Sequence, residues 1–129
     1  MQSINKYMKF SVNKADKYVS LELQEDKLNS LTAPKLKSEL VILREEGYRN
    51  IIFDLGKVEF VDSSGLSSIL IGNRIAKEAG GTFVICALKD QVQKLIKISQ
   101  LENILNIFPT NAEAVDFVLM EELERDLKQ

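Results

Sequence analysis

Three polar side chains, Asp62, Ser63 and Ser64, stand together between an apolar run and a helical pattern. A serine hydroxyl acts as a nucleophile when a neighbouring base takes its proton, and histidine is the usual base. The chain contains no histidine, and Gly-x-Ser-x-Gly is absent around these serines. Ser-His-Asp and Cys-His catalysis are therefore excluded, and we predict that the protein is not an enzyme.

Metal and nucleotide chemistry also lack the residues they need. Cys86 is the only cysteine and lies in the apolar run TFVICAL, which indicates a buried structural thiol. Carboxylates are then the only ordinary metal ligands left, and Asp54 and Glu59 do not have ligand spacing. No phosphate-binding Gly-x-x-x-x-Gly-Lys-Ser/Thr motif is present. We expect neither a metal nor a cofactor.

Composition limits the architecture and the partners. The chain has 129 residues, 45% of them hydrophobic, which suits one domain with its own core. Seventeen basic and nineteen acidic residues give a formal net charge of −2 with interleaved signs, so nucleic acid is an unfavourable partner. No apolar run approaches the roughly 20 residues that span a bilayer, and the N-terminus lacks a signal-peptide pattern. We expect a cytoplasmic protein without membrane insertion.

The hydrophobic pattern predicts the elements that position the serines. Alternation over 8–12 and 19–23 predicts a hairpin, and the apolar runs 50–55 and 82–88 predict central parallel strands. Helical spacing predicts one helix from Ala33 to Gly47 and another from about Gly65 to Gly80. Further along, the pattern predicts a short helix around 92–96, a short strand at 104–108, and a last helix opened by the capping box 110–113. The predicted order is ββαβαβαβα, an α/β domain with a mixed sheet over about 8–118, followed by a charged tail that we expect to fray.

The loop that carries the serines leaves the end of a strand and enters a helix, which is where ligands usually sit in open α/β sheets. Asp62, Ser63 and Ser64 are all good N-cap residues, so helix capping is the simplest interpretation. Capping needs only one of the three, and Gly65 is a poor choice for a first turn unless something approaches the backbone closely. A phosphate on a hydroxyl here would be tolerated, because the helix N-terminus favours an anion.

The segment VDSSGLSSIL, from Val61 to Leu70, resembles the signature of the bacterial anti-sigma factor antagonists, which are small single-domain members of the STAS family. The resemblance continues in LNSLTAPKLKSEL and NIIFDLGKVEF before it and in GGTFVICALKDQVQKLIKISQLENILNIFPTNAEAV after it, covering roughly 8–118. It implies a single STAS-like domain.

The resemblance also implies a mechanism. In that family the first serine after the aspartate is phosphorylated by the partner, an anti-sigma factor that is an ATP-dependent serine kinase, and this role falls on Ser63. The unphosphorylated antagonist binds the anti-sigma factor and frees a sigma factor, and a serine phosphatase resets the switch. The expected partner-binding loop comprises Asp62, Ser64, Gly65, Leu66 and Asn29.

The chain departs from the family pattern at two places. Asp26 and Asn29 stand where the family commonly has the glycine and aspartate of Gly-x-Leu-Asp, and that aspartate is usually close to the acceptor serine. Gln100 stands where the family often has a glycine that serves a helix C-terminus.

One alternative stays open at this point. A STAS protein of this size can also act as a scaffold subunit of a larger regulatory or transport complex without being phosphorylated. The Asp-Ser-Ser-Gly loop favours the switch, whereas Asn29 favours the scaffold.

Overall fold

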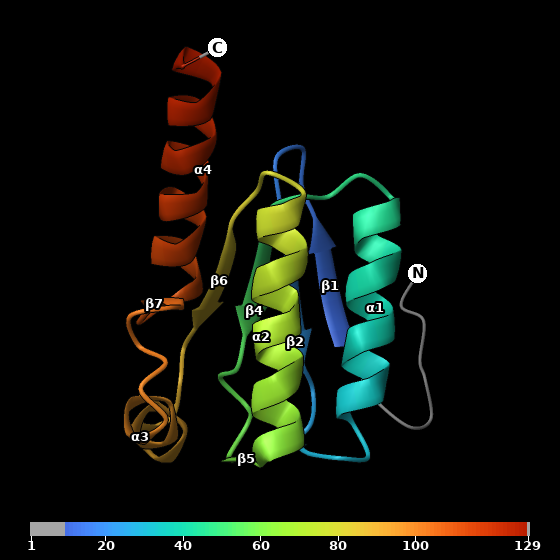
Figure 1. Cartoon of the computed structure of the whole chain (residues 1–129), viewed down its shortest axis with the longest axis vertical. Helices are drawn as coiled ribbons and strands as arrows, with labels where there is room; N and C mark the ends of the chain where they lie inside the picture. The colour runs from blue at the N-terminus through green and yellow to red at the C-terminus, as the bar shows by residue number, and fades with distance from the viewer. Residues whose placement is uncertain (1–9, 129) are drawn as a thin grey trace.

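The structure is a computed structural model, and it describes residues 10–128. Its strands are β1 (Phe10–Lys14), β2 (Val19–Leu23), β3 (Lys27–Leu28), β4 (Ile51–Asp54), β5 (Phe60–Val61), β6 (Phe83–Cys86) and β7 (Asn106–Phe108). Its helices are α1 (Ala33–Glu45), α2 (Ser63–Glu78), α3 (Asp90–Ile98) and α4 (Asn111–Leu127). Figure 1 shows α1 and α2 side by side in front of the sheet, with α4 at the left beside β6 and β7.

The main sheet has the strand order β1-β2-β4-β6-β7. β1 pairs with β2 in antiparallel register, and every other neighbouring pair is parallel. The predicted hairpin and the two predicted central parallel strands are thus confirmed, and the sheet is mixed as expected. Met8, which we assigned to the first strand, lies outside the described residues.

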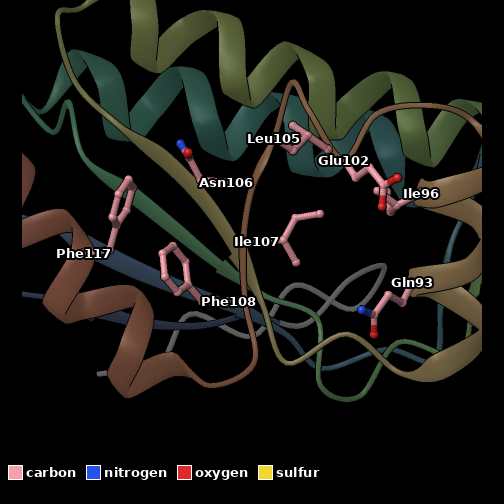
Figure 2. Close-up of a pocket in the computed structure, with 8 residues that line it drawn as sticks. All are labelled: Gln93, Ile96, Glu102, Leu105, Asn106, Ile107, Phe108 and Phe117. Carbon is pink, nitrogen blue, oxygen red and sulfur yellow. The ribbon is translucent and has the colours of Figure 1, made fainter.

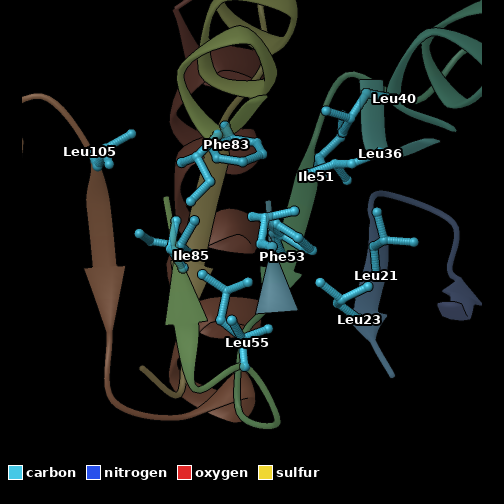
Figure 3. Packing of buried hydrophobic residues seen from close by; sticks show 14 of the residues in the cluster. Leu21, Leu23, Leu36, Leu40, Ile51, Phe53, Leu55, Phe83, Ile85 and Leu105 are labelled. Atoms are coloured by element: carbon cyan, nitrogen blue, oxygen red, sulfur yellow. The ribbon is translucent and has the colours of Figure 1, made fainter. Parts of the chain in front are cut away.

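Alternating residues of the central strands build two separate cores. Ile51 and Phe53 point to the face covered by α1 and α2, whereas Ile52 between them points to the face covered by α4. Figure 3 shows the side chains of the larger core converging from the strands and from α1. Leu36 and Leu40 are fully buried there, which is the apolar stripe that predicted the first helix.

The helix ends match the residues that predicted them. Gly47 and Gly80 both have positive φ, at 102° and 76°, and follow the last turns of α1 and α2. Thr110 caps α4 by accepting a hydrogen bond from the backbone N–H of Glu113 at 3.1 Å.

The structure corrects two expectations. A second sheet of two short parallel strands, β3 and β5, was not predicted. Two-residue strands leave no periodic pattern to detect. The charged tail was expected to fray, and this prediction was wrong: α4 continues to Leu127 because Glu122 is buried and holds its last turns to the sheet. None of the described helices is long and apolar enough to cross a bilayer.

Candidate functional site

The small sheet of β3 and β5 brings two loops together. The strands are parallel, with Leu28 opposite Val61, so the chain leaves both at the same edge. The backbone N–H of Asp62 donates a hydrogen bond to the carbonyl oxygen of Leu28 at 3.2 Å. The loop that begins at Asn29, after Leu28, therefore lies beside the loop that holds Ser63, after Asp62.

Asp62 is the residue that caps α2. Its backbone is extended, and its Oδ1 accepts a hydrogen bond from the N–H of Gly65 at 2.9 Å. Its carbonyl oxygen accepts the first helical hydrogen bond, from Leu66 at 2.9 Å. The helix thus begins at Ser63, two residues earlier than the sequence indicated, and one side chain completes the cap.

The two serines differ in exposure. Ser63 is exposed at the start of α2, whereas Ser64 is half-buried. Within the described part of the chain neither hydroxyl makes a hydrogen bond, and the side-chain cap of α2, which accepts from the N–H of Gly65, comes from Asp62. Ser63 is therefore the more accessible hydroxyl of the pair.

Gly65 explains how the two loops fit. It is buried, and a Cβ atom there would lie 2.3 Å from the carbonyl oxygen of Leu28 and 2.8 Å from Cγ1 of Val61. The sequence predicted a close approach to this backbone. The approaching group is the chain's own β3 strand.

Asn29 has a local structural task. Its Oδ1 accepts hydrogen bonds from the backbone N–H groups of Leu31 at 3.0 Å and Thr32 at 3.3 Å. Its own N–H donates to Thr32 Oγ1 at 2.8 Å. These bonds close the turn that leads into α1, so the Asn29 side chain is engaged in its own loop.

The remaining surface differs in part from the expectation. Leu66 is half-buried and packs against the larger core, so its side chain contributes little to an outer surface. Two apolar residues that the sequence analysis did not single out are exposed near the serines: Leu31 is 81% exposed and Phe60 is 53% exposed. The sequence did not predict the exposure of Phe60, because a strand of two residues, Phe60 and Val61, is too short to show which side chain faces the core.

The other residues considered for chemistry have structural roles. Cys86 is fully buried, and burial, with the nearby Asp54 carboxylate, raises the pKa of its thiol to about 12. Asp54 accepts a hydrogen bond from the N–H of Gly56 at 2.9 Å in its own loop. Among the described residues no group of three or more histidine, cysteine, aspartate or glutamate side chains is arranged to hold a metal ion.

A surface hollow of about 410 Å³ lies away from the serines. Figure 2 shows its lining from α3, the segment leading into β7, β7 itself and α4. Its apolar side chains are Ile96, Leu105, Ile107, Phe108 and Phe117. Ile107 is partly buried and packs against the larger core, and Phe108 and Phe117 pack in the same way against the smaller one. None of the residues predicted for the site lines this hollow.

Comparison with known proteins defines the class. The family model for the STAS domain matches residues 9–114, and the chain belongs to the STAS family. BtrV of Bordetella bronchiseptica, which carries the name of an anti-sigma factor antagonist, is 32% identical over 102 residues, covering 79% of this chain and 84% of BtrV. Members with that name are regulatory binding proteins.

Solved structures share the fold. The crystal structure of an anti-sigma factor antagonist from Thermotoga maritima superposes with a TM-score of 0.75 at 26% identity, over 84% of this chain and 93% of the other. SpoIIAA in its unphosphorylated form gives a TM-score of 0.73 at 21% identity, over 84% and 95% of the two chains. The Bacillus SpoIIAA in its phosphorylated form gives 0.66 at 20% identity, over 84% and 98%. The family resemblance seen in the sequence is thus confirmed.

Proposed function

We propose that this protein is an anti-sigma factor antagonist of the cytoplasm whose binding to an anti-sigma factor serine kinase is controlled by phosphorylation of Ser63. The observation that carries the proposal is that Asp62 and Ser63 have different roles at the start of α2. Asp62 caps the helix, and Ser63 keeps an exposed hydroxyl without a hydrogen bond in the described structure. The names of BtrV and of the Thermotoga maritima protein support the same role.

In the proposed reaction this chain is the acceptor of the phosphoryl group. Ser63 Oγ forms a bond to the γ-phosphorus of ATP held by the kinase, the bond from that phosphorus to the β–γ bridging oxygen breaks, and ADP leaves. The hydroxyl proton passes to a base of the kinase. A serine phosphatase later hydrolyses the phosphate ester and restores the hydroxyl.

The added phosphate changes the surface and leaves the fold intact. It carries about −1.5 to −2 charges, and the free N–H groups of the first turn and the helix dipole favour an anion there. The adjacent Asp62 carboxylate adds to the negative charge that a partner meets. Two unit charges 4 Å apart interact by about 4 kcal/mol at an effective dielectric constant near 20. A hundredfold loss of affinity, about 2.8 kcal/mol, lies within that range.

Leu31 and Phe60 extend the proposed contact surface. Leu31 lies in the loop that leaves β3, Phe60 opens β5, the strand that leads to Ser63, and both are largely exposed. Apolar side chains in the middle of an interface contribute most of the binding free energy, while charge decides whether the partner can approach. The phosphate would thus act on a contact that Leu31 and Phe60 stabilise.

The test uses the anti-sigma factor kinase of the source organism with ATP and magnesium. We expect one phosphate, mapped by peptide mass spectrometry to Ser63, and none in Ser63→Ala. Ser67→Ala is the matched control, because Ser67 is an exposed hydroxyl one turn further along α2. In calorimetry, Ser63→Ala should bind the kinase like the wild type and Ser63→Asp at least tenfold more weakly.

Two results would overturn the proposal. Equal affinity of Ser63→Ala and Ser63→Asp for the kinase would show that negative charge at position 63 does not control binding. Absence of phosphate on Ser63 in protein isolated from growing and from stressed cells, together with binding to a larger complex by every variant, would establish the scaffold function instead.

A further inference from the structure

The face of α4 that points away from the sheet carries an apolar stripe. Leu119, Met120, Leu123 and Leu127 are 42%, 59%, 55% and 75% exposed. Their spacing of three and four residues places them on one side of the helix. The opposite side holds Ala114, Val118 and Glu122, which are buried against the sheet. The helix is therefore apolar on its outer side as well as its inner side.

The orientation of this stripe is fixed by polar contacts beneath it. Glu122 accepts hydrogen bonds from Arg49 at 2.6 Å, from Asn50 at 2.8 Å and from Arg125 at 2.7 Å. Arg125 also donates to Thr82 Oγ1 at 2.9 Å. Rotation of α4 to bury the leucines would pull Glu122 away from three donors. The hydrogen bonds of Glu122 thus keep the apolar stripe of α4 exposed.

The charge around the stripe is strongly acidic. Between residues 111 and 128 the chain has six carboxylates and two basic side chains. Asp116, Glu124 and Asp126 are exposed on or beside the stripe, whereas Arg125 is turned inward onto Glu122. Lys128 is the one basic group left on the outer surface of the described part of this helix. A mainly acidic border of this kind favours partners of opposite charge.

We propose that the outer stripe of α4 is a docking surface for a basic amphipathic helix of a partner protein. Leucine-type side chains of that helix would cover Leu119, Met120, Leu123 and Leu127, and its lysine or arginine side chains would meet Asp116, Glu124 and Asp126. A second copy of this chain is a poorer occupant, because it would set acidic borders against each other. The basic helix satisfies both the apolar and the charged parts of the surface.

This surface is separate from the serine loop. Figure 1 shows the last turns of α4 at the end of the molecule opposite β5 and the start of α2. A partner on α4 would leave Ser63 accessible, so the inference goes beyond the proposed phosphoswitch. The phosphomimetic Ser63→Asp should bind the α4 partner like the wild type.

The test uses a synthetic helical peptide of leucine and lysine at a 3-4 spacing, compared with the same peptide carrying glutamate in place of lysine. Fluorescence anisotropy measures affinity, and ¹⁵N NMR chemical shifts locate the contact. We expect the lysine peptide to bind with shifts confined to α4, and the glutamate peptide at least tenfold more weakly. Leu123→Gln with Leu127→Gln should weaken the lysine peptide at least tenfold, and Asp116→Asn with Glu124→Gln should reduce its salt dependence.

The matched control is Val41→Gln with Ile42→Gln, two exposed apolar residues of α1 at 47% and 48% exposure, which should leave peptide binding unchanged. Circular dichroism melting confirms that each variant is folded. Equal binding of the two peptides, binding that survives the double leucine variant, or shifts centred elsewhere would overturn the inference. Sedimentation velocity showing a dimer that Leu123→Gln abolishes would assign the stripe to a second copy, and so would also overturn it.

Discussion

A Cβ atom placed on Gly65 would lie 2.3 Å from the carbonyl oxygen of Leu28. The start of α2 and the end of β3 are thus in backbone contact, and Val61 closes the same space at 2.8 Å. This contact joins the loop of Asn29 to the loop of Ser63. The proposed contact surface around Ser63 is therefore built from two loops that touch. Any larger side chain at Gly65 must push the loop of Asn29 away from the loop of Ser63.

Gly65→Ala should lower the free energy of unfolding by about 1–3 kcal/mol, the usual cost of overpacking a close-packed site. It should also weaken kinase binding, because the loop of Asn29 is displaced. Urea denaturation measures the first effect and calorimetry the second. Gly56→Ala is the control: its new Cβ would be 3.1 Å from the Asp54 side chain, which can adjust, so the loss should be clearly smaller. Equal losses in the two variants would contradict the assigned role of Gly65.

Much of the fold was predictable because the strands and helices of the main sheet are long enough to carry a pattern. Phe53 and Ile85 lie in nearly continuous apolar runs, and Leu36 and Leu40 repeat at helical spacing. The short strands β3 and β5 carry no such signal. The last turns of α4 were missed because their stability comes from Glu122 meeting Arg49 and Asn50, residues more than seventy positions away.

The sequence indicated which residues of the candidate site stand together, but it could not decide the structural role of each. A sequence places Asp62, Ser63 and Ser64 together, but three possible caps give no reason to choose one. The extended backbone at Asp62 decides the choice in its favour. The engagement of Asn29 with Leu31 and Thr32 depends on the path of a loop, which composition does not specify.

Asp62→Ala should destabilise the protein by about 1 kcal/mol, because the N–H of Gly65 loses its acceptor. Asp62→Asn keeps an acceptor in place and should stay within a few tenths of a kcal/mol of the wild type. Thr110→Ala removes the cap of α4 and should destabilise the protein by a similar amount to Asp62→Ala. Urea denaturation compares all three, and Ser63 phosphorylation rates should fall in Asp62→Ala alone. A loss in Asp62→Asn as large as in Asp62→Ala would show that the carboxylate charge, rather than the cap, is what stabilises α2.

Gln100→Gly should stabilise the protein by about 0.5–1 kcal/mol. Gln100 follows α3 with a φ of 60°, a conformation that glycine adopts without strain, and its side chain is exposed. The backbone bonds that end the helix, from Gln100 to Lys97 and from Leu101 to Ile96, do not involve the side chain. Calorimetric melting should rise by a few degrees.

The control for this substitution is Lys94→Gly, in the middle of the same helix. Glycine has no conformational advantage there, and the cost should be about 1 kcal/mol. A decrease in stability for Gln100→Gly would show that the glutamine side chain makes a contribution larger than its backbone strain.

Glu122→Gln should lower the free energy of unfolding at pH 7 by about 2 kcal/mol, between the values for exposed and for fully buried ion pairs. Burial by itself raises the pKa of this carboxyl, but hydrogen bonds from Arg49, Asn50 and Arg125 outweigh it and hold the pKa at about 2, below the ordinary 4.5. A carboxyl whose pKa is depressed in the folded state stabilises the fold above its unfolded pKa. That contribution disappears as the pH falls from about 5 to about 2.

The measurement is urea denaturation of the wild type and of Glu122→Gln from pH 7 to pH 2.5. The gap between the two proteins should be widest at pH 7 and should narrow steadily below pH 5. Glu124→Gln is the control, because Glu124 is exposed on the same turn of α4. Its stability should follow the wild type within about 0.5 kcal/mol at every pH. A gap for Glu122→Gln that stays constant with pH would show that packing of the side chain, and not its charge, anchors the last turns of α4.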